Sequence, residues 1–163
     1  MPYAHKNTGR PADNLGPVIT DMINNSSYLD EANEPLFPFG HGLGYTRFEY
    51  GDLVVETPRL GLGDTLAVSV TVSNVGERAG DEVVQLYVRD LVGSVSRPVK
   101  ELKAFQRITL EAGESRSLQL EVPVQALGFH GLDMAYRVEA GAFRLWVGPN
   151  AAEGLEGAFE VTE

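Results

Sequence analysis

Strict alternation of apolar and polar residues constrains this chain more than any other feature. Between Thr65 and Ser73, Leu or Val stands at every second position and Thr, Ser or Ala stands between them. Successive side chains of a β-strand point to opposite faces, so this pattern predicts a strand with one buried face. The same alternation recurs at Val84, Leu86 and Val88, at Leu118, Leu120 and Val122, and at Phe143, Leu145 and Val147.

Turn residues separate these alternating segments at short intervals. Gly marks the breaks at 74–76, 112–114 and 140–141. The spacing predicts about seven or eight strands, and no long amphipathic helix interrupts them. We therefore expect an all-β fold, an antiparallel β-sandwich, with edge strands at 48–56 and 155–161.

The first 46 residues lack this periodicity and are rich in helix and strand breakers. They end in an aromatic stretch, Glu34 to Tyr50, that combines Phe and Tyr with two Pro and three Gly. Pro and Gly disfavour a regular helix or a central strand here. A monomer rarely leaves a large apolar patch in water, so we expect something outside this segment to cover it.

Composition excludes several classes of function. The chain has 23 acidic and 13 basic residues and a net charge of −10, which disfavours nucleic acid and anionic lipid as partners. Cysteine is absent, so disulfides and thiolate chemistry are excluded. No apolar run is long enough to span a membrane, and the start carries no targeting signal. One local basic run is interpreted as a solvated sheet face: Arg89, Arg97, Lys100, Lys103 and Arg107.

No complete catalytic, metal or cofactor site is recognisable in the residues themselves. The three histidines have no spacing typical of a metal site, so neither a metal ion nor another cofactor is expected. The neighbouring acids Asp81 and Glu82 are candidates for a glycosidase pair, which needs two carboxyls about 5 to 9 Å apart. Adjacent acids are more often solvated. No nucleophile motif of the G-x-S-x-G type is present.

Several motifs in order resemble the C-terminal end of glycoside hydrolase family 3 β-glucosidases, especially the bacterial periplasmic type. They are N-T-G-R-P at 7–11, the stretch Y-L-D-E-A-N-E-P-L-F-P-F-G-H-G-L-G-Y-T-R-F at 28–48, D-E-V-V-Q-L-Y-V-R-D at 81–90, S-R-P-V-K-E-L-K-A-F at 96–105 and L-E-A-G-E-S at 110–115. The resemblance covers nearly the whole chain.

The resemblance implies a fibronectin type III-like (immunoglobulin-like) sandwich over 46–163. Residues 1–45 would be the tail of the preceding α/β sandwich domain and its connection. In such enzymes, which hydrolyse terminal β-D-glucosyl residues with retention, the nucleophile and the acid/base lie upstream of anything present here. The chain alone is therefore expected to be inactive, and its partners would be the barrel and α/β sandwich domains of the same parent chain. The parent would be periplasmic or secreted, with the cytoplasm left open.

The resemblance also implies roles for individual residues. Arg10 lies in the loop that faces the active-site entrance and is a candidate for binding the sugar in the leaving-group subsite, through its planar set of donors. Asn7 and Lys6 are weaker candidates for the same β-glucoside or oligosaccharide substrate. The apolar residues expected to dock on the catalytic domains are Leu36, Phe37, Phe39, Tyr45 and Phe48.

A second hypothesis stays open from the sequence. The chain is alternatively a free-standing β-sandwich that binds carbohydrate or protein, with the aromatic stretch as its recognition surface. Aromatic platforms for sugars usually present a flat Trp or Tyr ring. The single Trp, Trp146, lies in a predicted strand where either face of the sheet is possible.

Overall fold

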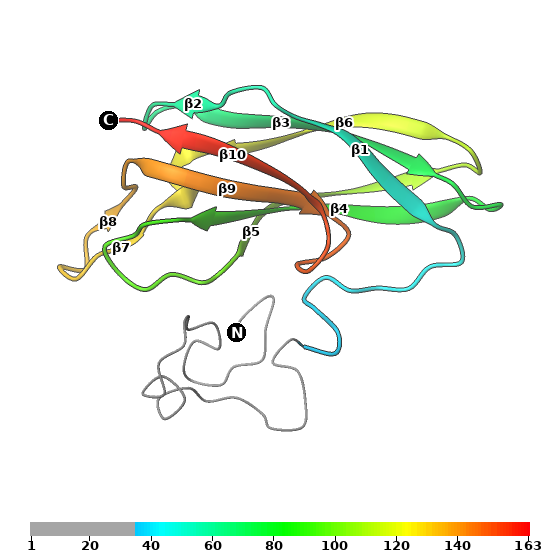
Figure 1. The fold of residues 1–163 in the computed structure, drawn as a ribbon, viewed down its shortest axis with the longest axis horizontal. Helices are drawn as coiled ribbons and strands as arrows, with labels where there is room; N and C mark the ends of the chain where they lie inside the picture. Colours follow the sequence, from blue (N-terminus) through cyan, green and yellow to red (C-terminus); the bar gives the residue numbers. More distant parts are fainter. Residues whose placement is uncertain (1–34) are drawn as a thin grey trace, which may run out of the picture.

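The structure is a computed structural model that describes residues 35–163. Two sheets lie one over the other, as Figure 1 shows. The first has the order β1 (Phe48–Val55), β3 (Thr65–Asn74), β6 (Ser115–Pro123). The second has the order β2 (Arg59–Leu60), β10 (Leu155–Val161), β9 (Gly141–Gly148), β4 (Gly80–Asp90), β5 (Glu101–Leu110). A short 3-10 helix, η1 (Val124–Leu127), follows β6 and leads to the hairpin of β7 (Phe129–His130) and β8 (Tyr136–Arg137).

The core lies between the two sheets and consists of the residues that alternate in the sequence. Every aliphatic or aromatic residue of the four predicted sets is buried, which confirms the all-β sandwich. The rings of Phe143 and Phe159 stack at 5.1 Å between centroids and join β9 to β10 in this core. Burial of these apolar surfaces supplies the main driving force for folding.

The edges of the sheets differ in part from the expectation. β1 is an edge strand as predicted, but β10 is not, because β2 pairs with its end in parallel. After β1 the chain crosses to the other sheet, where Arg59 lies opposite Glu160 and forms an ion pair with it at 3.2 Å. Glu160 therefore helps to hold the short strand β2 against the end of β10. By strand order, the other long edge strands are β5 and β6.

The outer face of β4 is unusual because part of it is buried. Val84, Leu86 and Val88 point into the core, so Gln85 and Tyr87 point away from it, and neither belongs to the core cluster. Both are nevertheless buried. Their cover is the segment that enters from the N-terminal side, residues 35–47, together with the turn that follows β9. This covered region positions the candidate site.

Candidate docking surface

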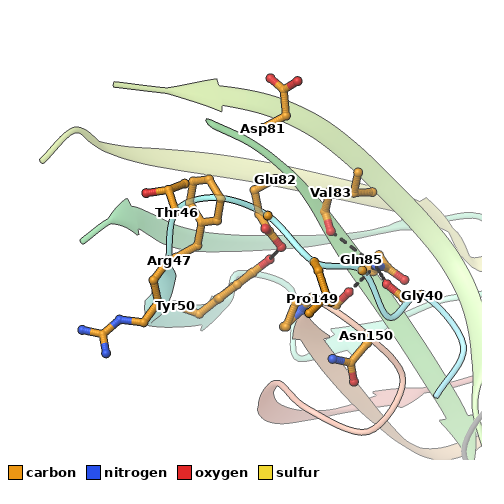
Figure 2. Close-up of a pocket in the computed structure, with 14 residues that line it drawn as sticks. Gly40, Thr46, Arg47, Tyr50, Asp81, Glu82, Val83, Gln85, Pro149 and Asn150 are labelled. Atoms are coloured by element: carbon orange, nitrogen blue, oxygen red, sulfur yellow. Dashed lines mark hydrogen bonds between the residues drawn. The ribbon is translucent and has the colours of Figure 1, made fainter. Parts of the chain in front are cut away.

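The entering segment is attached to the sandwich at Phe39 and Gly40. The buried amide of Gln85 donates through Nε2 to the carbonyl of Gly40 at 3.4 Å and to the carbonyl of Pro149 (Figure 2). The backbone amide of Ala151 donates to the Phe39 carbonyl at 2.9 Å. Burying a polar group without a hydrogen bond costs folding free energy. Here the backbone of the entering segment supplies an acceptor to the Gln85 amide.

Only glycine fits at position 40. Its φ is +83°, a conformation that residues with a side chain rarely adopt. A Cβ atom built there would lie 2.1 Å from Oε1 of Gln85. The Gly40 backbone can therefore approach the Gln85 amide closely only because glycine has no side chain.

A second attachment lies just before β1. The Thr46 hydroxyl donates to Oδ1 of Asn74 at 2.6 Å, and the Val75 amide donates to the Arg47 carbonyl at 2.8 Å. The Asn74 side chain is itself buried and donates to the carbonyls of Arg78, at 2.7 Å, and of Leu110, at 3.1 Å. Two buried amides therefore hold the segment, Gln85 through the Gly40 carbonyl and Asn74 through the Thr46 hydroxyl.

The apolar side chains of the segment are exposed on both sides of the attachment at Gly40. Leu36 is 83% exposed, Tyr45 is 95% exposed, and Phe37 and Phe39 are also exposed. Leu43, 93% exposed, belongs to the same set, although the sequence did not single it out. Its position between Gly42 and Gly44 in the aromatic stretch could have indicated that it is exposed. We call these five side chains, on residues 36–45, the apolar strip.

Phe48 differs from the other residues expected to dock. Its side chain is partly buried and packs against the sandwich core. The reason is its place in β1 opposite Asn74, where the ring closes the end of the core. Phe48 thus contributes to the fold of the sandwich and is not one of the exposed side chains.

A hollow of about 390 Å³ lies beside the apolar strip, between the entering segment, β4 and the turn after β9. Glu82 is half-buried in its wall and accepts a hydrogen bond of 2.7 Å from the hydroxyl of Tyr50. Burial raises the pKa of the Glu82 carboxyl above its ordinary value, and the hydrogen bond from Tyr50 opposes this. Burial and then the neighbouring Glu82 raise the pKa of Tyr50 as well, so the phenol stays neutral.

Asp81 and Glu82 do not form a catalytic pair. They are neighbours on β4, so their side chains point to opposite faces of the sheet. Asp81 accepts hydrogen bonds from Thr109 and Arg107, which hold the pKa of its carboxyl below its ordinary value. Because the two carboxyls face apart, they cannot flank one glycosidic bond.

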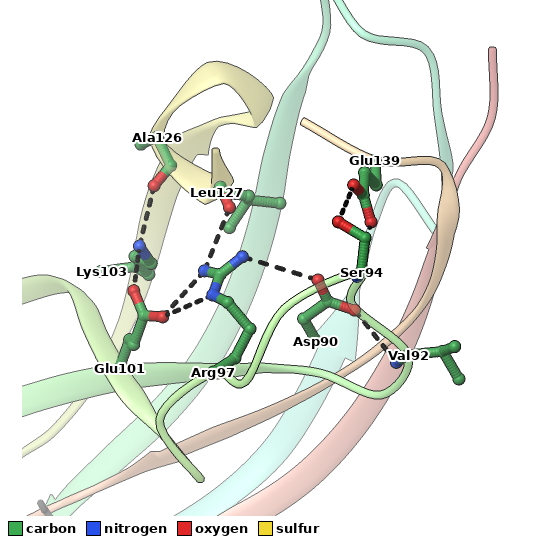
Figure 3. Close-up of polar contacts among 9 residues, drawn as sticks. All are labelled: Asp90, Val92, Ser94, Arg97, Glu101, Lys103, Ala126, Leu127 and Glu139. Carbon is green, nitrogen blue, oxygen red and sulfur yellow. Dashed lines mark hydrogen bonds and ion pairs between the residues drawn. The ribbon is translucent and has the colours of Figure 1, made fainter. Parts of the chain in front are cut away.

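The basic run contains a buried network, which corrects the expectation of a solvated face (Figure 3). The Arg97 side chain is only 10% exposed. Its guanidinium donates to Glu101 at 2.8 Å, lies 3.6 Å from Asp90 and donates to the Leu127 carbonyl at 3.3 Å. Lys103 pairs with Glu101 at 2.7 Å. The network fixes residues 91–100, the connection between β4 and β5, against η1.

Comparison with known proteins places this geometry in a family. A family profile, the fibronectin type III-like domain, matches residues 82–151. A periplasmic β-glucosidase of Salmonella typhimurium is 40% identical over 159 residues, which cover 98% of this chain and 20% of that protein. The chain contains a fibronectin type III-like domain and is similar to one part of β-glucosidases.

Two further comparisons agree with this assignment. A β-xylosidase of Formosa agariphila is 44% identical over 117 residues, 72% of this chain and 16% of that protein. The crystal structure of a β-glucosidase from Listeria innocua in complex with glucose superposes with a TM-score of 0.82 and 36% identity, covering all of this chain and 22% of that one. The chain thus spans about a fifth of the length of the relatives it matches.

In this fibronectin type III-like domain the single Trp lies on the outer face of the sheet. The ammonium of Lys100 lies 4.2 Å from the centroid of the Trp146 ring, and Lys100 also donates to the Ala151 carbonyl at 2.8 Å. The indole Nε1 donates to Glu156 at 3.2 Å. Burial lowers the pKa of Lys100, and Glu156 opposes this effect. One face of the indole is therefore occupied by a cation of the domain itself.

The candidate sugar ligands and the possibility of a metal site remain to be considered. Lys6, Asn7 and Arg10, the candidate sugar ligands, fall outside residues 35–163. Within that range no group of three or more His, Cys, Asp or Glu side chains is placed to hold a metal ion. In the same part of the chain no helix has the length and hydropathy to cross a membrane.

Proposed function

We propose that this chain is the non-catalytic C-terminal accessory region of a retaining β-glucosidase, and that it stabilises the catalytic domains by docking on them. The apolar strip is the observation that carries this proposal. Gln85 and Asn74 hold the segment that carries it, through Gly40 and Thr46, while the apolar side chains are exposed. A free monomer gains nothing from holding apolar side chains outward, whereas a partner surface gains a preorganised contact.

The partners in this proposal are the barrel and the α/β sandwich domain of the same parent chain. Residues 1–45 would close the α/β sandwich domain and connect it to the fibronectin type III-like domain of 46–163. Two features support this division. The chain spans about a fifth of its relatives, and the first strand begins at Phe48.

The proposed substrate of the parent is a terminal β-D-glucoside. The names of the relatives support a β-glycoside more strongly than one particular sugar, because a β-xylosidase is among them. Arg10, with Asn7 and Lys6, is proposed to contact the sugar in the leaving-group subsite. A periplasmic location of the parent is proposed from the Salmonella relative.

The alternative function, a free-standing carbohydrate-binding module, has less support. Sugar rings stack on open aromatic faces, and the Trp146 ring already carries Lys100 on one face. The exposed aromatics of the apolar strip lie on a connecting segment beside the hollow rather than on a flat sheet face.

The experiment compares three preparations: this chain alone, the parent enzyme, and the parent enzyme from which residues 46–163 have been removed. Each is assayed with an aryl β-glucoside, and thermal unfolding is followed in parallel. We expect no turnover by the chain alone and a lower unfolding temperature for the truncated parent. Turnover by this chain alone that is lost on substituting one of its residues would contradict the proposal, as would a truncated parent of unchanged stability.

A further inference from the structure

The carboxylate of Glu82 differs from its neighbours in lacking a cation. On the same strand, β4, Asp81 is paired with Arg107 and Asp90 with Arg97, which also pairs with Glu101 of β5. Among residues 35–163, the partner of Glu82 within hydrogen-bond distance is the neutral hydroxyl of Tyr50. A half-buried charge without an opposite charge costs folding free energy, so its retention calls for an explanation.

The hollow in front of Glu82 is open on the side of the entering segment. A Cβ at Gly42 would meet no atom within 4 Å, so the rim there is only backbone. Arg47 also lines the hollow, but its guanidinium points away from Glu82 (Figure 2) and pairs with Glu49 at 3.4 Å. The basic side chain that lines the hollow is thus directed away from Glu82.

We propose that the hollow receives a basic side chain, Arg or Lys, from the catalytic part of the parent enzyme, and that this side chain pairs with Glu82. The proposal rests on the proposed function and names the chemistry of the partner at that surface. Leu43 also lines the hollow, and its apolar side chain, which is 93% exposed, would be covered by the partner. A charged pair at the centre of an apolar contact fixes its register and gains strength as water is excluded.

Such a pair explains the position of Tyr50. Its hydroxyl donates to Oε1 of Glu82 and leaves Oε2 for a second donor. A carboxylate accepts several hydrogen bonds, so the phenol and the incoming cation can be bound at the same time. The phenol holds the carboxylate in one orientation before the partner arrives.

The test measures binding between this chain and a separately produced polypeptide that comprises the rest of the parent enzyme. Titration calorimetry is run with the unsubstituted chain and with Glu82→Gln, Tyr50→Phe and Asp81→Asn. We expect Glu82→Gln to raise Kd about tenfold or more, the scale of a lost hydrogen bond to a charged group. Asp81→Asn, a carboxylate already paired at the surface, should change Kd less than about twofold.

Tyr50→Phe separates the proposal from a purely structural role of the Tyr50–Glu82 hydrogen bond. The variant removes the neutral donor but leaves the charge, so binding should stay within about threefold of the unsubstituted chain, since one neutral hydrogen bond contributes little net. Unchanged binding by Glu82→Gln, or equal weakening by Glu82→Gln and Tyr50→Phe, would overturn the cation proposal alone. Absence of any binding by the unsubstituted chain would overturn the proposed function as well.

Discussion

Two irregular connections of this domain are fixed in opposite ways. The segment 35–47 is held by the buried amides of Gln85 and Asn74, through the Gly40 carbonyl and the Thr46 hydroxyl, and its apolar side chains are exposed. The loop 91–100 is attached through a charged side chain, because Arg97 is buried between Asp90 and Glu101. We propose that the first connection holds a surface for a partner, whereas the second pairs its charges within the domain.

The difference teaches how to distinguish a docking element from a structural loop. Both contain exposed apolar residues, since Val92 of the loop is exposed as well. What separates them is the kind of group that attaches them, neutral amides in the segment and a buried arginine in the loop. Attachment of the segment leaves the side chains of Leu36 and Tyr45 exposed, whereas the buried Arg97 makes the loop part of the fold.

The largest expected effect tests the loop. Arg97→Met leaves two acidic side chains buried with one cation fewer, so the free energy of unfolding should fall by about 3–5 kcal/mol. Urea denaturation followed by circular dichroism measures it. The matched control is Arg107→Met, which removes an exposed pair with Asp81 and should leave the midpoint nearly unchanged. Equal effects of the two substitutions would show that the Arg97 network is not structurally important.

A smaller effect tests the attachment of the segment. Gly40→Ala forces a side chain into a positive φ and against Gln85, so we expect a loss of roughly 1–3 kcal/mol. Hydrogen exchange of the Ala151 amide, which donates to Phe39, should accelerate in the same variant. Gly42→Ala, where the added Cβ meets open space, is the control. Slower exchange at Ala151 in Gly40→Ala than in Gly42→Ala would contradict the attachment.

The smallest effect is the pH dependence of stability, which should have opposite signs in the two regions. Burial opposes ionisation of Glu101, but hydrogen bonds from Lys103 and Arg97 prevail and lower its pKa below 4.5. Its stabilisation is thus present above pH 4.5 and is lost as the pH falls through the lowered pKa. The raised pKa of Glu82 acts in reverse, because the folded state takes up this proton at a higher pH than the unfolded chain.

Unfolding by urea between pH 3 and pH 7, values that bracket the ordinary Glu pKa of about 4.3, measures these two contributions. Glu101→Gln should flatten the loss of stability below pH 4.5. Glu82→Gln should remove a gain of stability that accompanies acidification above pH 4.5. The same sign for both variants would contradict the charge distribution described here.

The sequence predicted the sandwich because the core residues alternate with polar residues along each strand. Val68 or Leu145 can be assigned to a buried face from their neighbours alone, and both are buried. The end of β10 was misjudged because its partner, β2, has two residues and pairs only after the chain changes sheets. Arg97 was misjudged for a similar reason, since burial of an arginine depends on acids brought close by the turn from β4 to β5.

The exposure of the candidate surface could be predicted in part. Apolar residues among Pro and Gly indicated a segment that needs a cover, and Leu36, Phe37, Phe39 and Tyr45 are exposed on it, while their docking stays a prediction. Phe48 was assigned to the same set, although it joins the core, because alternation does not mark where β1 begins. The two amides that fix the segment are distant in sequence from it, so no local pattern relates them to Gly40 or Thr46.

The most direct test of the central claim is binding of this chain to the rest of the parent enzyme when the apolar strip is made polar. Leu36→Ser/Phe37→Ser/Tyr45→Ser should leave the unfolding free energy nearly unchanged, since these side chains are exposed, and should raise Kd at least about a hundredfold, the scale of losing several hot-spot contacts. The control, Val92→Ser/Leu132→Ser, removes exposed apolar side chains elsewhere and should bind as the unsubstituted chain does. Equal Kd values for the two variants would contradict the account.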